Sequence, residues 1–129
     1  MTDYVVDTYA WIEYFEGTKA GERVRGIVEN PENRLMTPAP MLAEIRSKFL
    51  REGRDPEPPS IAVEEASEIV ALDARLARAA GDEHARRRKT VRDFGMMHAF
   101  LLATAQARGA TILTGDRHFK GVTGVDFLA

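Results

Sequence analysis

Short apolar segments, too short to form helices, alternate along the 129-residue chain with longer segments of helical periodicity. The predicted strands span residues 4–6, 34–37, 68–72, 110–113 and 125–128, and the predicted helices span residues 9–15, 20–29, 41–51, 74–88 and 94–108. This alternation favours an α/β fold in which a central, mainly parallel sheet carries helices on both faces, giving a three-layer sandwich.

The length of the chain suits one domain with one sizeable core. The stretch RDPEPPS, residues 54–60, is the one segment of linker-like composition, and it is too short to separate two domains. We therefore expect residues 1–129 to form a single domain, with residues 54–60 as a surface loop.

The composition excludes several classes of protein. The formal net charge is −2, so any polyanionic partner must be held by a local basic patch or by metal ions. Without cysteine there are no disulfides or thiolate metal sites, and the three histidines are too scattered in the sequence to suggest a zinc site. Since no apolar run could span a membrane and the first residues lack a signal-peptide pattern, we expect a cytoplasmic protein without a membrane partner.

Two predicted strands run into an aspartate: Asp7 follows YVV, and Asp116 follows ILTG. Sites in open parallel sheets form at the carboxyl ends of the strands, where the crossover connections part. Asp73 has a similar position after EIVAL, and for any single aspartate the simpler interpretation is a cap on the next helix. Neither the Asp7 strand nor the Asp116 strand contains a basic residue to neutralise its acid, so we expect a cation between these two carboxylates.

Glu44 lies in the predicted helix MLAEIRSKFL, beside the apolar stripe of Leu42, Ile45 and Phe49. Taken alone, it would be an exposed residue that pairs with Lys48 one turn later. Together with two strand-end aspartates, it completes a carboxylate set that suits Mg²⁺ or Mn²⁺, which take oxygen ligands along with water and a phosphate. Such an ion activates water and offsets charge on a phosphate under in-line attack, which is the chemistry of a nuclease.

The segment ARRRKTVR, residues 85–92, is the densest positive cluster in the chain. Its basic residues could bind the phosphate groups of RNA. A solvated helix end that complements the helix dipole is an equally good interpretation. The candidate RNA-binding residues are Arg86, Arg87, Arg88, Lys89 and Arg92.

Three stretches carry a resemblance to a known family: VVDTYAWIEYFEG, the AEI of the central helix, and DFGMMHAFLLATAQARGATILTGDRHF. In these stretches the chain resembles the PIN-domain ribonucleases, and most closely the VapC-type toxins of toxin–antitoxin pairs, of an archaeal type. The likeness covers nearly the whole chain, and its specific parts are the opening VVDTYAW and the closing ATAQARGATILTGDRHF. It implies a metal-dependent endoribonuclease that forms a homodimer and binds a VapB-like antitoxin.

The resemblance also assigns residues. It implies that Asp7, Glu44 and Asp116 are the catalytic, metal-binding acids, and that a hydroxyl of Thr8 or Thr114 lies near the metal-bound water. These assignments agree with the carboxylates that the strand ends and the central helix single out independently.

The chain departs from the family pattern at two positions. The family's third acid usually opens the last long helix in a D-A-x-x-x-A-T-A pattern, where this chain has His98 in HAFLLATA, and a further acid often occupies the position of His118. Imidazole binds transition ions better than Mg²⁺, so His98 is a candidate ligand in a site that prefers Mn²⁺. The alternative is that His98 bonds a backbone carbonyl and has no part in the chemistry. Asp93, at the expected start of the helix, is a candidate outer ligand or a plain N-cap.

Three hypotheses of function remain open at this point. The leading one is a metal-dependent endoribonuclease with the role of a toxin. The second, favoured by His98 and His118, is a catalytically silent PIN-fold module that binds RNA or a protein partner. The third is a phosphatase or other phosphotransferase of the same α/β plan, which is disfavoured because no D-x-D pattern follows the first strand.

Overall fold

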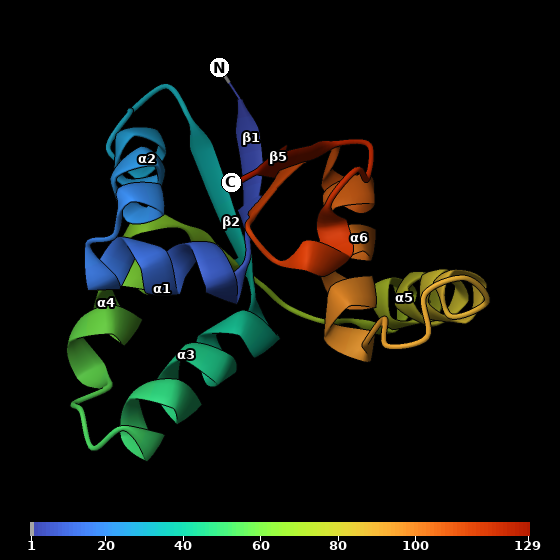
Figure 1. The fold of residues 1–129 in the computed structure, drawn as a ribbon, viewed down its shortest axis with the longest axis horizontal. Coiled ribbons are helices and arrows are strands. Elements are labelled where there is room, and N and C mark those ends of the chain that lie inside the picture. Colours follow the sequence, from blue (N-terminus) through green and yellow to red (C-terminus); the bar gives the residue numbers. More distant parts are fainter. Residues whose placement is uncertain (1) are drawn as a thin grey trace.

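The computed structural model describes residues 2–129, and in this range five strands form one sheet with the order β3-β2-β1-β4-β5. All neighbouring strands are parallel, and β1 and β2 run side by side in Figure 1. The strands are β1 (Asp3–Val6), β2 (Arg34–Pro38), β3 (Glu68–Val70), β4 (Thr111–Thr114) and β5 (Val125–Phe127). The helices are α1 (Thr8–Glu16), α2 (Lys19–Val28), α3 (Ala39–Arg51), α4 (Glu57–Ala66), α5 (Ala74–Arg87) and α6 (Met96–Arg108), with a short 3₁₀ helix η1 (Arg117–Phe119).

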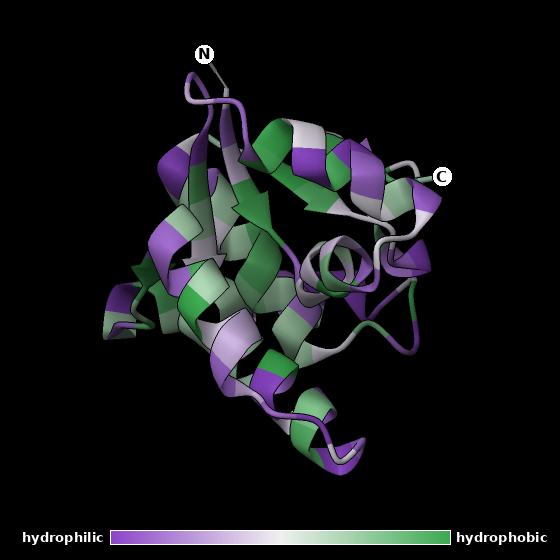
Figure 2. Cartoon of the chain, turned by 90° about the vertical axis from the view of Figure 1, so that its left-hand side faces the viewer, coloured by the Kyte–Doolittle hydropathy of each residue, from purple (hydrophilic) through white to green (hydrophobic). Residues whose placement is uncertain are grey.

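The sheet separates two hydrophobic cores, one on each face. Neighbouring residues of a strand point to opposite faces. Val5 of β1 and Ile112 of β4 accordingly join the core under α5 and α6, whereas Val6 and Leu113 join the core under α1 to α4. In Figure 2 hydrophobic residues occupy much of the strands and parts of the helices, and the turns and loops are largely hydrophilic. The predicted three-layer α/β sandwich is thus confirmed.

The segment predicted as a surface loop contains the start of a helix, so that prediction was wrong. Residues 54–56 have no regular secondary structure, but α4 begins at Glu57 and carries Pro58 and Pro59 in its first turn. Proline is tolerated there because the first amides of a helix have no partner within the helix. Pro59 is buried, and Arg46 of α3 pairs with Glu57 at 2.9 Å, which ties α4 to α3.

The last long helix begins later than predicted, and Asp93 is not its N-cap. Gly95 occupies the N-cap position, and α6 starts at Met96. The preceding turn is held in place by Phe94, which is buried against the core under α5 and α6. The Asp93 side chain pairs with Arg117 instead.

The backbones of α1 and α2 approach each other closely at Gly21. A Cβ atom added at Gly21 would lie 1.9 Å from the carbonyl oxygen of Glu13, so no larger residue fits between the two helices. None of the helices in the described part of the chain is long and apolar enough to cross a membrane.

Candidate active site

Asp7 and Asp116 lie where the order of the sheet reverses. From β1 the chain proceeds outward through β2 to β3, and it returns to the other side of β1 as β4. The carboxyl ends of β1 and β4 are therefore neighbours at a topological switch point, the place where open α/β sheets build their sites. Asp7 directly follows β1, and Asp116 lies two residues beyond β4.

Asp7 is a buried acid that is held on both carboxylate oxygens. Its Oδ1 accepts a 2.7 Å hydrogen bond from the amide of Thr8, so that Asp7 is the N-cap of α1. Its Oδ2 accepts a 2.7 Å bond from the Thr114 hydroxyl. Burial raises the pKa of Asp7 to about 6, against the lowering effect of these hydrogen bonds, and the charges of Asp116 and Glu44 raise it further.

Thr114 connects the two strand ends. While its hydroxyl donates to Asp7, the same oxygen accepts a 3.0 Å bond from the backbone amide of Asp116. Thr114 is fully buried, so this arrangement is shielded from water. Thr114 thus fixes both aspartates relative to each other.

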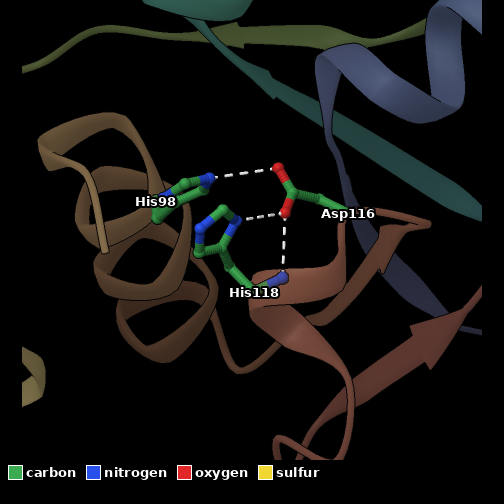
Figure 3. A group of neighbouring side chains, drawn as sticks. All are labelled: His98, Asp116 and His118. Carbon is green, nitrogen blue, oxygen red and sulfur yellow. Dashed lines mark hydrogen bonds and ion pairs between the residues drawn. The ribbon is translucent and has the colours of Figure 1, made fainter. Parts of the chain in front are cut away.

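Asp116 accepts three hydrogen bonds. The amide of His118 and its ring Nδ1 contact Oδ1 at 2.9 and 2.6 Å, and Nε2 of His98 lies 3.0 Å from Oδ2 (Figure 3). Burial alone would raise the pKa of Asp116, but the bonds from His118 and His98 together outweigh it and hold the pKa below its usual value. In turn, the hydrogen bond to Asp116 raises the pKa of His118.

Glu44 reaches the same site from α3. It is exposed, and its Oε1 accepts a 2.7 Å bond from the hydroxyl of Thr8. Glu44 does not form the ion pair with Lys48 that its helical spacing allowed, because Lys48 contacts Glu52 at 2.7 Å. Asp73, by contrast, is the plain helix cap of the simpler interpretation, since it accepts from the amide of Leu76.

One hollow of about 250 Å³ collects these groups, with all three predicted carboxylates, Thr8 and His98 in its wall. Tyr9, Met41 and Met97 complete the lining. Sequence reasoning missed Tyr9, which is 40% exposed at the rim. A Cβ at Gly115 would lie 2.3 Å from the Tyr9 ring, so Gly115 leaves room for Tyr9, and no local sequence pattern signals this contact.

Asp93 borders this site only through His118. Its Oδ2 lies 3.1 Å from His118 Nε2, close enough for an ion pair with a protonated ring, although these atoms are not aligned for a hydrogen bond. Contacts with His118 and Arg117 lower the pKa of Asp93 to about 2.

The basic segment divides into two parts. Arg86 and Arg87 both hold the buried Glu83, at 2.6 and 3.3 Å. Burial alone would raise the pKa of Glu83, but Arg86, Gln106 and Arg87 together lower it. The remaining three basic residues are exposed, and no acid of residues 2–129 forms an ion pair with them: Arg88, Lys89 and Arg92.

The carboxylate set fits a hard divalent cation. Asp7 is buried beside two further acids whose charges raise its pKa, so a cation in the hollow would relieve both the repulsion and the cost of burial. Carboxylate oxygens are the ligands that Mg²⁺ and Mn²⁺ take. A second group also has suitable spacing: one ligand atom each from His98, Asp116 and His118 lie within 4.8 Å of one another (Figure 3).

A parallel α/β sheet with carboxylates at its switch point defines a class of α/β proteins whose site lies at the carboxyl ends of the strands. Within that class, the PIN domain matches residues 4–125, so the chain belongs to the PIN-domain family, as its motifs indicated. No curated protein matches the sequence significantly.

Solved structures share the fold over the full length. A toxin–antitoxin complex from Klebsiella pneumoniae is similar with a TM-score of 0.74 and 18% identity, covering 98% of both chains. VapC20 of Mycobacterium tuberculosis, described as a Sarcin-Ricin loop cleaving toxin, gives a TM-score of 0.74 at 16% identity and covers 98% of this chain and 99% of its own. The DNA-bound VapBC of Salmonella typhimurium gives 0.73 at 19% identity and covers both chains completely.

Proposed function

We propose that this protein is a metal-dependent endoribonuclease and the toxin of a toxin–antitoxin pair, acting in the cytoplasm on cellular RNA. One observation carries the proposal: Asp7, Glu44 and Asp116 come from three separate elements and meet in one hollow of a PIN-domain chain. The Klebsiella and Mycobacterium structures of the same fold, described as a toxin–antitoxin complex and a cleaving toxin, support the role.

The residues of the chain prepare the site for a cation and a phosphodiester. Asp7, Glu44 and Asp116 would hold the ion, which supplies activation of water and neutralisation of phosphate charge. Thr114 and Thr8 donate hydroxyl protons to Asp7 and Glu44, so one oxygen of each acid is already oriented. The unfavourable burial of the Asp7 charge is the feature that would favour uptake of a cation.

A cleavage assay with the purified chain tests this function. Single-stranded RNA should be cut internally with Mg²⁺ or Mn²⁺ present and remain intact with a chelator. The second candidate is a catalytically silent module, and it is supported by His98 and His118 at positions where the family has acids. This candidate predicts that the chain binds RNA or a partner but does not cleave RNA with either ion. Equal cleavage with and without chelator would contradict metal dependence.

The partners follow from the same proposal. The VapBC structure from Salmonella typhimurium has the fold of this chain, which supports a VapB-like antitoxin as partner. We further propose that the toxin is a homodimer, and a monomer by light scattering at micromolar concentration would contradict this.

Replacing Arg88, Lys89 and Arg92 together by alanine should weaken RNA binding. Three lost phosphate contacts should reduce the slope of log affinity against log salt by about 2 for single-stranded RNA. Fluorescence anisotropy in a salt series measures this slope, in an Asp7→Asn background that is expected to prevent cleavage.

The matched control is Arg75→Ala with Arg78→Ala, two exposed residues in the first turns of α5, the helix that Arg88, Lys89 and Arg92 follow. This control should leave the slope unchanged. If both variants reduce it equally, the RNA follows no defined path along the end of α5, and the assignment of the three residues is wrong.

A further inference from the structure

His98 is oriented by the first turn of α6. It is the third residue of the helix, and its Nδ1 accepts a 2.8 Å hydrogen bond from the amide of Gly95, the N-cap residue. Its Nε2 points to the other side, 3.0 Å from Oδ2 of Asp116 (Figure 3). Both ring nitrogens are therefore engaged within the protein.

These two contacts determine where the ring proton lies. A backbone N–H can only donate, so Nδ1 must offer a lone pair to Gly95, and the proton of the neutral ring is on Nε2. Nε2 then donates to the Asp116 carboxylate. A histidine that binds a metal through Nε2 has the reverse arrangement, because its other nitrogen carries the proton and donates it to a carboxylate or carbonyl.

His118 also donates hydrogen bonds to Asp116. Its amide and its Nδ1 both face Oδ1 of Asp116, and a carboxylate oxygen can only accept. The rings of His98 and His118 lie against each other, with centroids 4.2 Å apart and planes inclined by 30°. The two imidazoles thus hold one carboxylate between two donors.

We propose that His98 is a positioning residue that donates a hydrogen bond to Asp116 and does not bind the metal. The inference rests on the proposed cation site and specifies its ligands: the ion is held by Asp7, Glu44 and Asp116 alone. It also reverses the expectation drawn from the sequence, since without a nitrogen ligand there is no imidazole-based preference for Mn²⁺ over Mg²⁺.

Two substitutions of His98 distinguish a hydrogen-bond donor from a metal ligand. Glutamine at the third position of a helix can accept from the N-cap amide, as in a capping box, and its amide nitrogen can donate to Asp116 but has no lone pair for a metal. His98→Gln therefore keeps the positioning role and removes any ligand nitrogen. His98→Ala removes both.

The test is isothermal titration of the full-length chain with Mg²⁺ and with Mn²⁺. His98→Gln should keep both affinities within about threefold of the parent, whereas His98→Ala should lose roughly tenfold or more, as outer partners of metal ligands do. A His98→Gln variant that loses as much as His98→Ala, or that loses more for Mn²⁺ than for Mg²⁺, overturns the proposal. So does a His98→Ala variant that binds like the parent.

A second readout does not depend on metal binding or on activity. Long-range ¹⁵N–¹H correlation spectra at mildly alkaline pH should show Nδ1 of His98 unprotonated and Nε2 protonated, both before and after Mg²⁺ is added. A neutral ring with its proton on Nδ1 would contradict the donor role of Nε2, and a change of tautomer when Mg²⁺ or Zn²⁺ is added would identify His98 as a ligand of the His98–Asp116–His118 group. If the parent binds neither Mg²⁺ nor Mn²⁺, the proposed function fails, and the spectra still decide the role of His98.

Discussion

Asp7→Asn is expected to abolish RNA cleavage, with a loss of at least ~100-fold, since even the outer partners of metal ligands contribute 10- to 100-fold. The amide keeps the size of the side chain and can still accept from Thr8, which holds Oδ1 at 2.7 Å in the parent. It removes the negative charge that a divalent ion requires. Gel-based cleavage of a labelled RNA by parent and variant measures the loss.

The same substitution should stabilise the metal-free protein at neutral pH. With a pKa of about 6 in the folded state and 3.8 as reference, Asp7 binds more protons folded than unfolded between these values. The unfolding free energy contributed by this group therefore falls as pH rises from about 4 to about 6, by about 3 kcal/mol for a shift of roughly two units. Asparagine has no charge to bury and so avoids this loss, although it weakens the bond to Thr114. The unfolding free energy of the variant should therefore exceed that of the parent by about 1–2 kcal/mol. Urea denaturation with chelator present measures this difference.

Asp73→Asn is the matched control for both measurements. Asp73 also follows a strand and caps a helix, but it lies outside the hollow. Asparagine caps helices as well as aspartate does, so cleavage and stability should both remain close to the parent. Equal loss of cleavage in the two variants would show that the assay reports folding and not the site.

Gly21→Ala should destabilise the protein by about 3 kcal/mol or more, at the upper end of the range for overpacking. The added Cβ would lie 1.9 Å from the carbonyl oxygen of Glu13, and this atom belongs to the backbone of α1. No side chain can rotate away to relieve the contact, so the two helices must separate. A chain of this size should show a fall in Tm on the order of 10 °C by differential scanning calorimetry.

Gly26→Ala, in the same helix, should have the opposite effect on stability. A Cβ at Gly26 meets nothing within 4 Å, and the residue is exposed. Alanine is favoured over glycine inside a helix by about 0.5–1 kcal/mol, so this variant should be slightly more stable than the parent. If Gly21→Ala were also neutral or stabilising, the close approach of α1 and α2 would be wrong.

The sequence predicted those parts of the site that follow from strand ends. Asp7 and Asp116 follow short apolar runs, and parallel strands carry their carboxyl ends to one edge, so the sequence alone could place both acids together. Glu44 was harder, because its helical neighbours allowed a pair with Lys48. Its choice depended on its combination with the two aspartates, with which the family resemblance agreed, and the structure adds a contact with Thr8 36 residues away.

The sequence did not predict the starts of two helices, and the two reasons differ. The start of α4 was missed because Pro58 and Pro59 signal a loop, although both are acceptable in a first helical turn. The start of α6 depends on the His98 side chain. Its Nδ1 caps the helix by accepting from the Gly95 amide, and its Nε2 contacts Asp116, 18 residues later. Periodicity within a helix contains no information about such a contact.

The central claim is that Asp7, Glu44 and Asp116 form a single site for a divalent cation. An anomalous difference map from a crystal soaked in Mn²⁺ tests it most directly, because the peak locates the ion independently of activity. The expected result is a peak in the hollow in contact with oxygens of these three carboxylates, with no ring nitrogen of His98 among the ligands. A peak held by His98 and His118, or no peak between the three acids at saturating Mn²⁺, would contradict the account.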